Sequence, residues 1–229
     1  MTNTLHRFGS AESFRDDIIV HAIPAKGKAS AQGNALPALK RFLEIAAEYN
    51  PINLGDALHG GALRATRSKR LWTHFFKRDD RKNYKQVIDG LTAPTTVAAV
   101  FDKLENAEAF VKRLKEEDFG VSVNISSSIT NAQACCKHAG LKRHSIGYSL
   151  GFEGMGDNIP NSQAVMLSTM CGHGMVAQSL AKKMIDFVKE NRRTPEAAAA
   201  SMARFCACGI FNTTRAVRIL EAARVGSKE

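Results

Sequence analysis

The feature that most constrains the fold is a regular alternation of short apolar runs and amphipathic stretches after residue 95. The apolar runs are rich in valine and isoleucine, as strands are, whereas the stretches between them repeat their apolar residues at helical spacing. Strands that alternate with helices of this length are typical of βαβ units, which place their strands parallel in one sheet. We therefore expect three strands and two helices, over residues 97–101, 106–117, 121–125, 130–138 and 145–150.

The first part of the chain extends this pattern. A β-branched run over residues 18–23 is ended by Pro24 and predicts a buried strand. Residues 36–49 carry an apolar helical face, and residues 52–56 are compatible with a short strand.

A chain of 229 residues is long enough for one sizeable domain. The sequence thus predicts a single α/β domain over residues 1–229, in which helices flank a mainly parallel sheet. Two parts stand out within it: a basic excursion near residues 60–90 and a helical C-terminal part over residues 169–224.

The excursion holds most of the net charge. Between Arg64 and Lys85 there are nine basic and two acidic residues, or +7 of the formal net charge of +10. The same segment contains the single tryptophan, Trp72, together with Phe75 and Phe76. Tryptophan, phenylalanine and arginine are enriched in protein interfaces, so we expect a docking arm for a homo-oligomer or a protein complex. A solvated surface segment ranks second. Nucleic acid is less favoured, because no nucleic-acid-binding motif accompanies the charge.

Two short motifs near the C-terminus each place cysteine beside glycine just ahead of an expected helix. They are Cys171-Gly172-His173-Gly174 and Cys206-Ala207-Cys208-Gly209. The helices that follow are expected over residues 177–191 and 213–224, and the N-terminus of a helix favours thiolates and anionic ligands. Gly172 and Gly209 would let the backbone approach a cofactor closely.

Cys171, Cys206, Cys208 and His173 are soft ligands, and we expect them to converge because a helical hairpin near residue 195 can return the chain to its starting level. Three cysteines suit an iron–sulfur cluster, with the fourth iron open to substrate or bound by His173. The alternative is a closed zinc site with the same four ligands.

The functional hypothesis is a metalloprotein that acts as a lyase-type or redox enzyme, or as a subunit of one. One alternative is a metal-free thiol enzyme, with Cys171 as nucleophile and His173 or His21 as base. Another is a non-catalytic assembly or structural subunit that holds zinc and docks through the basic arm. The plainest alternative remains that each cysteine is only a small buried side chain, and that His173 is structural.

Loops after the predicted strands supply further candidates for a small anionic ligand. They are Lys26 and Lys28 after the first strand, Ser126 and Ser127 after the strand over residues 121–125, and Glu153 in a glycine-rich loop. Together with His173, Glu153 is the candidate acid or base. Solvated lysines, a helix-capping serine and a solvated carboxylate are the alternatives for these positions.

The compartment is expected to be the cytoplasm. Five cysteines are an odd number without disulfide spacing, and Cys135 and Cys136 are adjacent on an expected helix, where we treat them as bystanders. No apolar run approaches the roughly 20 residues that cross a membrane, and the N-terminus lacks the apolar core of a signal peptide.

Overall fold

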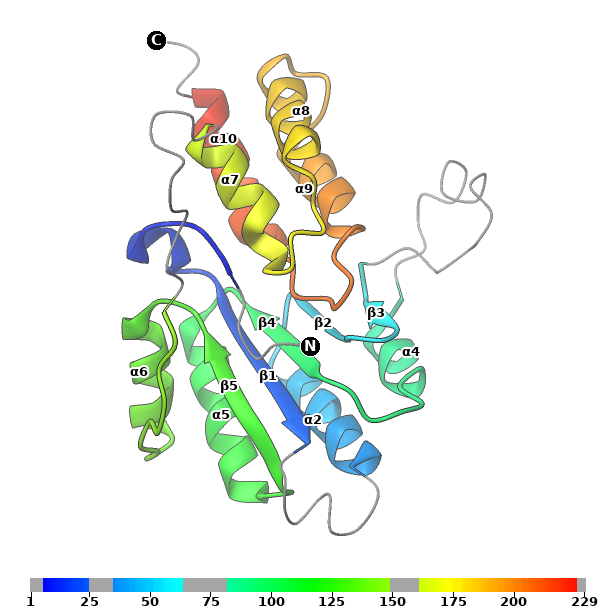
Figure 1. Cartoon of the computed structure of the whole chain (residues 1–229), viewed down its shortest axis with the longest axis vertical. Helices are drawn as coiled ribbons and strands as arrows, with labels where there is room; N and C mark the ends of the chain where they lie inside the picture. The colour runs from blue at the N-terminus through cyan, green and yellow to red at the C-terminus, as the bar shows by residue number, and fades with distance from the viewer. Residues whose placement is uncertain (1–5, 25–34, 64–81, 149–160, 226–229) are drawn as a thin grey trace.

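A computed structural model describes residues 6–24, 35–63, 82–148 and 161–225 of the chain. These residues contain one sheet, whose strands are β1 (Ile18–Pro24), β2 (Asn53–Asp56), β3 (Gly60–Gly61), β4 (Val97–Phe101) and β5 (Val121–Ser126). The strands lie in the order β3-β2-β4-β1-β5 (Figure 1).

Every neighbouring pair in this sheet is antiparallel, so the expectation of a mainly parallel sheet is wrong. The reason lies in how the two βαβ units are arranged. Helix α2 (Leu36–Glu48) joins β1 to β2, and helix α5 (Leu104–Glu117) joins β4 to β5. Within each unit the two strands are parallel, but a strand of the other unit lies between them. Interleaving two parallel pairs makes all adjacent strands antiparallel.

The connectivity β1-α2-β2-β4-α5-β5 with the order β2-β4-β1-β5 is the split βαβ arrangement of the ferredoxin-like fold. That name describes topology only and carries no implication for a cofactor. The short strand β3 extends the sheet beyond β2.

One face of the sheet is covered by α2 and α5, with α4 (Tyr84–Asp89) and α6 (Ile129–His138) beside them. Phe42, Phe101 and Phe110 meet at the centre of this core. The ring of Phe110 lies 5.1 Å from that of Phe42 and 5.3 Å from that of Phe101. Aromatic rings at such distances add to the stabilisation that burial provides.

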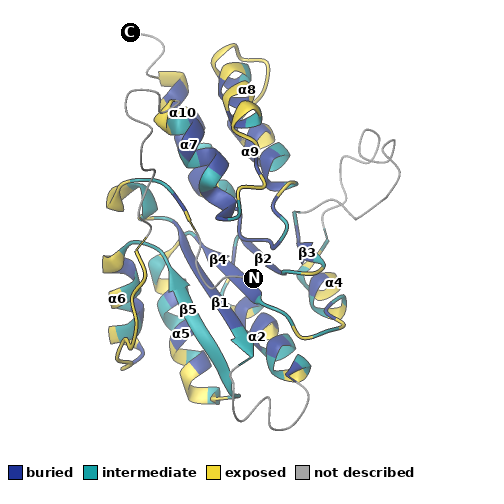
Figure 2. Ribbon diagram, viewed as in Figure 1, coloured by how far each residue is buried: buried dark blue, intermediate teal, exposed yellow. Residues whose placement is uncertain are grey.

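A helical layer formed by α7 (Ser162–Ser168), α8 (Gln178–Lys189), α9 (Pro195–Ala203) and α10 (Thr213–Val225) stands beyond one end of the strands in Figure 1 and shares a second core with the sheet. Ile19, Ala98 and Val100 point from the sheet into this layer, whereas their neighbours along β1 and β4 point into the other core. The central strands are therefore buried on both faces (Figure 2). This explains their continuous apolar sequences, which do not distinguish parallel from antiparallel pairing.

The strand expected over residues 145–150 does not form in its described part. Residues 145–148 have no regular structure, and Ile146 and Tyr148 are 48% and 65% exposed. Residues 149 and 150 lie outside the described ranges. The alternation of apolar residues predicted this strand. Ile146 and Tyr148 flank Gly147, and neither packs against the sheet.

The basic excursion leaves and re-enters the fold at one place. The backbone N–H of Lys82 donates to the carbonyl of Ala62 at 3.1 Å, which brings the two ends of the segment together. Residues 64–81 themselves lie outside the described ranges. Within those ranges, none of the helices combines the length and the apolarity that a bilayer crossing requires.

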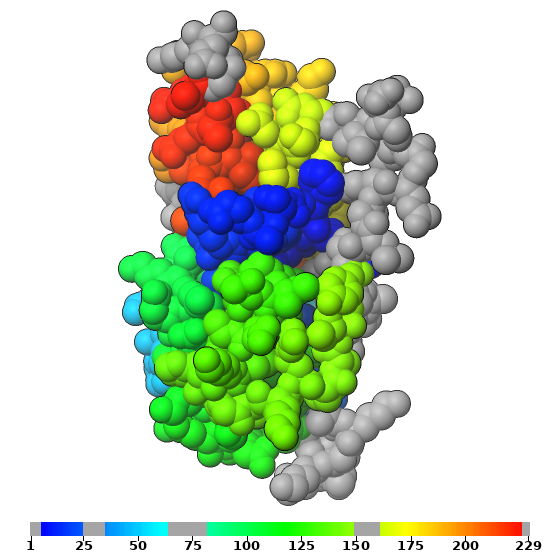
Figure 3. Space-filling view, turned by 90° about the vertical axis from the view of Figure 1, so that its left-hand side faces the viewer, coloured from blue at the N-terminus to red at the C-terminus, as the bar shows by residue number. Residues whose placement is uncertain are grey.

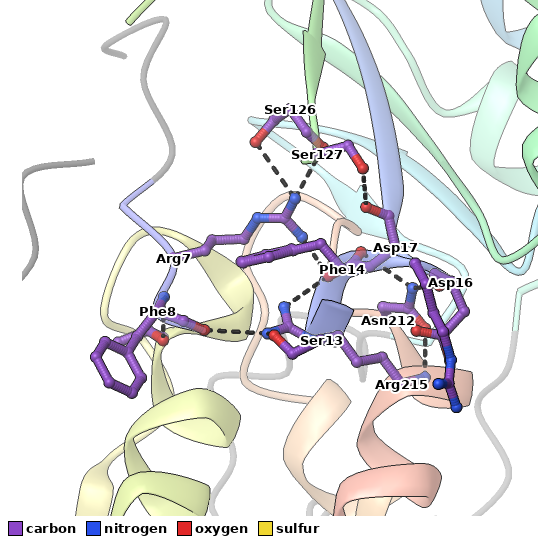
Figure 4. Close-up of polar contacts among 12 residues, drawn as sticks. Arg7, Phe8, Ser13, Phe14, Asp16, Asp17, Ser126, Ser127, Asn212 and Arg215 are labelled. Carbon is purple, nitrogen blue, oxygen red and sulfur yellow. Dashed lines mark hydrogen bonds and ion pairs between the residues drawn. The ribbon is translucent and has the colours of Figure 1, made fainter. Parts of the chain in front are cut away.

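The N-terminal segment joins the sheet to the helical layer through a buried ion group. Asp17 Oδ2 accepts from Arg7 at 2.5 Å and from Arg215 at 2.8 Å, and its Oδ1 accepts from Asn212 Nδ2 at 3.0 Å (Figure 4). The three charged side chains are at most 3% exposed. Burial by itself raises the pKa of the Asp17 carboxyl. The two guanidinium groups and the hydrogen bonds outweigh burial, so the pKa lies below its ordinary value.

The same arginines reach parts of the chain that are far apart in sequence. Arg7 Nη2 donates to the carbonyl of Ser126 at 2.8 Å, and Arg215 Nη2 donates to the carbonyl of Phe8 at 3.0 Å. Both guanidinium groups also lie over the Phe14 ring, at 5.0 and 3.9 Å from its centroid. In the space-filling view the N-terminal residues form a blue band between the C-terminal helices, in yellow and red, and the green part of the chain that holds β5 and α6 (Figure 3).

We expect Asp17→Ala to lower the free energy of unfolding by about 3–5 kcal/mol, because it leaves two buried guanidinium groups without their counter-ion. Urea unfolding followed by circular dichroism measures this loss. Asp89 is the matched control, since both it and its ion-pair partner Lys85 are exposed. Asp89→Ala should change the free energy by no more than about 0.5 kcal/mol. Equal effects of the two substitutions would show that the buried ion group is not a main support of the fold.

Acid should destabilise the fold through the carboxyl of Asp17. The pKa of Asp17 is lower in the folded chain than in the unfolded chain, where it is about 3.9. Its carboxylate therefore stabilises the fold fully above about pH 4, and this stabilisation is lost as the pH falls through the pKa of the folded state. The free energy of unfolding should therefore fall below about pH 4, and less steeply in Asp17→Asn than in the wild type. The slopes are measured by urea unfolding at several pH values.

Candidate metal centre

Both cysteine motifs lie in connections of the helical layer, on the side that faces the sheet. Cys171 ends the short 3-10 helix η3 (Thr169–Cys171) between α7 and α8, and Cys206 and Cys208 lie in the cysteine loop, residues 204–212, between α9 and α10. The three thiols are 0%, 1% and 6% exposed and belong to one core cluster. The α8–α9 hairpin returns the chain as expected, because its helices pack against each other and against α10.

The two motifs make direct contact. His173 Nδ1 lies 3.4 Å from Cys208 Sγ, although 35 residues separate them. The thiol of Cys208 donates a hydrogen bond to the sulfur of Cys206. The charge of Cys171 is near enough to Cys208 to raise its pKa further. The structure thus brings His173, Cys206 and Cys208 together, and the charge of Cys171 is near enough to act on Cys208.

Backbone N–H groups surround the cysteine sulfurs. The sulfur of Cys206 accepts hydrogen bonds from the Cys208 side chain and from the backbone N–H groups of Cys208, Ile210 and Phe211. These donors outweigh burial and lower the pKa of the Cys206 thiol to about 6. In the first motif the N–H of Met175 donates to Cys171 Sγ at 3.2 Å. The surroundings of the Cys206 sulfur thus favour its thiolate form.

The remaining two groups are neutral in this arrangement. Donation to Cys206, followed by burial, raises the pKa of the Cys208 thiol far above its ordinary value. Burial lowers the pKa of the His173 imidazole, which is therefore uncharged at pH 7, the form that binds metals. His173 Nε2 is buried and has no hydrogen-bond partner among the described residues.

Close backbone packing fixes the cysteine loop on the sheet. Gly209 has a φ of +74°, and a Cβ built on it would lie 2.7 Å from Gly61 Cα and 3.1 Å from Gly55 Cα. Asn53 Nδ2 also donates to the carbonyl of Phe211 at 3.3 Å. From the sequence, Gly209 was expected to allow a close approach of the backbone, whereas no role was expected for Gly55, Gly61 and Asn53. The only signal for these three was the density of small residues around β2 and β3.

The described residues contain no three His, Cys, Asp or Glu side chains already placed around a common point for a metal ion. Cys206 Sγ is turned toward its own loop, where the backbone donors hold it. Binding of a metal by Cys171, Cys206, Cys208 and His173 would thus need side-chain rotation within the cluster. Cys135 is separate, because it is buried in the core on the other face of the sheet, where burial raises the pKa of its thiol to about 12.

Of the other sequence candidates, Ser126 and Ser127 belong to a different part of the structure. Ser126 Oγ accepts from Arg7 Nη2 at 3.3 Å, and Ser127 Oγ donates to the carbonyl of Asp17 at 2.8 Å, so both hydroxyls take part in the buried ion group. Gly172 takes a left-handed conformation at the end of η3, and its carbonyl accepts from His6 N. Three candidates, Lys26, Lys28 and Glu153, lie outside the described ranges.

Comparisons with known proteins add no identity. No family model, no curated protein and no solved structure matches this chain. The arguments for function therefore rest on the chemistry of the described side chains.

We expect Gly209→Ala to destabilise the protein and to displace the cysteine loop, because the added methyl group would meet the backbone of β2 and β3. Gly174→Ala is the matched control. Its φ is +67° but its added Cβ would meet nothing within 4 Å, so it measures the conformational cost alone, about 1–2 kcal/mol. Gly209→Ala should exceed this cost by about 1–3 kcal/mol in urea unfolding. Equal losses would show that the close packing contributes nothing.

Proposed function

We propose that this protein is a metalloprotein whose centre is formed by Cys171, Cys206, Cys208 and His173. The observation that carries the proposal is the contact between the two motifs, in which His173 Nδ1 lies 3.4 Å from Cys208 Sγ beside the hydrogen-bonded Cys206. Thiolates and a neutral imidazole in a buried volume suit a thiophilic metal. The contact runs through Nδ1, so this nitrogen is the ligand atom of the proposal, and the buried Nε2 on the other side of the ring adds nothing to it.

The spacing favours a single tetrahedral ion such as zinc. With zinc–nitrogen bonds near 2.0–2.1 Å and zinc–sulfur bonds near 2.3 Å, nitrogen and sulfur ligands of one tetrahedral ion lie roughly 3.6 Å apart. The observed 3.4 Å between His173 and Cys208 is close to this value. A site with all four ligands would be closed, as structural zinc sites are.

The second candidate is the iron–sulfur cluster. The N–H groups that donate to the sulfurs of Cys171 and Cys206 favour it, because such donors stabilise cluster thiolates and tune their potential. Each ligand of a cluster binds its own iron, so His173 and Cys208 would have to move apart or His173 would stay unbound. An iron left open in this way would suit a lyase that adds or removes water, or a redox enzyme, with Glu153 as a candidate acid or base.

The thiol-enzyme alternative receives less support. Cys171 is fully buried and its sulfur accepts from the backbone of Met175, which gives a substrate no access to it.

All five cysteines are free, which agrees with the reducing cytoplasm that we propose as the compartment.

We expect the purified chain to hold one metal centre, measured by mass spectrometry of the metals and by visible absorption. Substituting serine for Cys171, Cys206 or Cys208 should remove most of the metal. Serine at Cys135 or Cys136 should not, because Cys135 lies in the other core and Cys136 is its neighbour on α6.

The metal distinguishes the two candidates. One zinc per chain, with a tetrahedral thiolate spectrum after exchange for cobalt, supports the single ion. Iron with sulfide, and the broad visible absorption of a cluster, supports the second candidate. Less than a tenth of an equivalent of either metal, after anaerobic purification from metal-supplemented cells, would overturn the proposal.

A protein partner at the basic segment remains the second part of the proposal. Because Lys82 N and the carbonyl of Ala62 are 3.1 Å apart, residues 64–81 can be replaced by a short glycine–serine linker without straining the described fold. We expect this variant to keep its circular dichroism spectrum but to have a smaller oligomeric mass in light scattering. An unchanged mass together with lost binding to nucleic acid would favour nucleic acid as the partner instead.

A further inference from the structure

A second group of side chains, separate from the cysteines, lies at the turn between β2 and β3. Asp56 ends β2, His59 lies in the turn that follows, and Thr92 lies in the connection between α4 and β4. The three side chains contact one another in sequence, from carboxylate to imidazole to hydroxyl. Neither the metal centre nor the buried ion group uses any of them.

The carboxylate sets the orientation of the imidazole. The Asp56 side chain is fully buried, and its Oδ1 accepts from His59 Nδ1 at 3.1 Å as well as from the backbone N–H groups of Leu58 and His59, at 2.8 and 2.7 Å. A carboxylate oxygen only accepts hydrogen bonds, so Nδ1 carries the proton and Nε2 presents its lone pair.

That lone pair faces a hydroxyl group at the surface. His59 Nε2 lies 3.4 Å from Thr92 Oγ1, Thr92 is exposed and the His59 side chain is 35% exposed. The hydroxyl is therefore the donor in this contact. Contacts between a nucleophile and its base are often long without substrate and tighten in the complex.

Stabilisation of the turn does not account for the whole group. The two backbone N–H bonds would suffice to hold the turn, yet Asp56 also binds the imidazole and aligns it with a hydroxyl from another part of the chain. Its second oxygen, Oδ2, is buried without a hydrogen-bond partner among the described residues. A buried carboxylate that binds one ring nitrogen fixes the orientation of the imidazole, as the third group does beside a general base.

We propose that Asp56, His59 and Thr92 form a site for acyl transfer from small carboxylic esters. Thr92 Oγ attacks the ester carbonyl while His59 Nε2 takes the hydroxyl proton, which gives a tetrahedral intermediate. The intermediate breaks its bond to the leaving alcohol oxygen, which receives the proton from His59, and the acyl group stays on Thr92. Water then attacks the acyl-threonine with His59 as base, releases the carboxylic acid and restores the hydroxyl. Asp56 acts as the positioning residue.

The full-length chain tests this proposal with p-nitrophenyl acetate as the probe. Rapid mixing should show release of nitrophenol, and peptide mapping after an acid quench should place an acetyl group on Thr92. His59→Gln should slow acylation at least about 100-fold, the smaller effect expected from loss of a general base. Thr92→Val should abolish acetylation at that position. Thr95→Val, which removes a hydroxyl from the same connection, should leave the rate unchanged.

Two further measurements keep the proposal falsifiable if a variant unfolds. Nitrogen NMR of the wild-type protein should show His59 with its proton on Nδ1, and a proton on Nε2 would overturn the proposal. Treatment with a metal chelator should not change the acylation rate, because the group contains no ligand of the proposed metal centre. An unmodified Thr92, or an acetyl group found on His59 in Thr92→Val at the wild-type rate, would also overturn it.

Discussion

The buried carboxylate of Asp17 is the interaction on which the arrangement of the layers depends. It lies just before β1 and binds arginines from the N-terminal segment and from α10, so one side chain connects the sheet, the N-terminus and the helical layer. It also binds Asn212, whose Oδ1 accepts from the N–H of Arg215 at the start of α10. Because Asn212 ends the cysteine loop, the same network fixes one end of the candidate metal centre.

The buried charges of this network do not balance, so every hydrogen-bond partner is needed. Two guanidinium groups share one carboxylate, and burial lowers the pKa of Arg215 even though Asp17 raises it. The second positive charge is compensated by neutral acceptors, which are the carbonyls of Phe8 and Ser126, and by the face of the Phe14 ring. Loss of one partner would leave a buried charge, so the network ties the layers to one relative position.

The elements of the fold could be read from the sequence, but their pairing could not. Periodicity located the helices that became α2, α5, α6, α8 and α10, since the spacing of apolar residues depends only on the local backbone. It also located β1, β4 and β5. Each crossover skips one strand, however, and this is decided by packing between segments far apart in sequence. A strand buried on both faces has the same apolar run in either direction, so the sequence had no signal against a parallel sheet.

The candidate metal centre, like the fold, could be predicted from the sequence only in part. Cysteine and glycine ahead of two expected helices indicated the candidate ligands, and the hairpin between them made a contact between the two motifs feasible. The surface that receives the cysteine loop could not be predicted, because Gly55, Gly61 and Asn53 acquire their role only when β2 and β3 lie beneath Gly209. Arg7, Asp17 and Arg215 were missed because isolated charged residues are usually exposed, and nothing local distinguishes a buried pair.

The two candidate sites lie on opposite faces of strand β2. Successive side chains of a strand point to opposite faces, so Gly55 faces the cysteine loop while Asp56 faces the core that contains α2 and α4. A Cβ at position 55 would lie 2.5 Å from Gly61 Cα, so glycine there lets β3 lie close to β2, whereas the buried Asp56 holds His59. The thickness of the sheet separates the two chemistries. Both sites nevertheless depend on the position of β2 and of the turn into β3, because Gly55 and Gly61 lie under Gly209 while Asp56 and His59 lie between them in the chain.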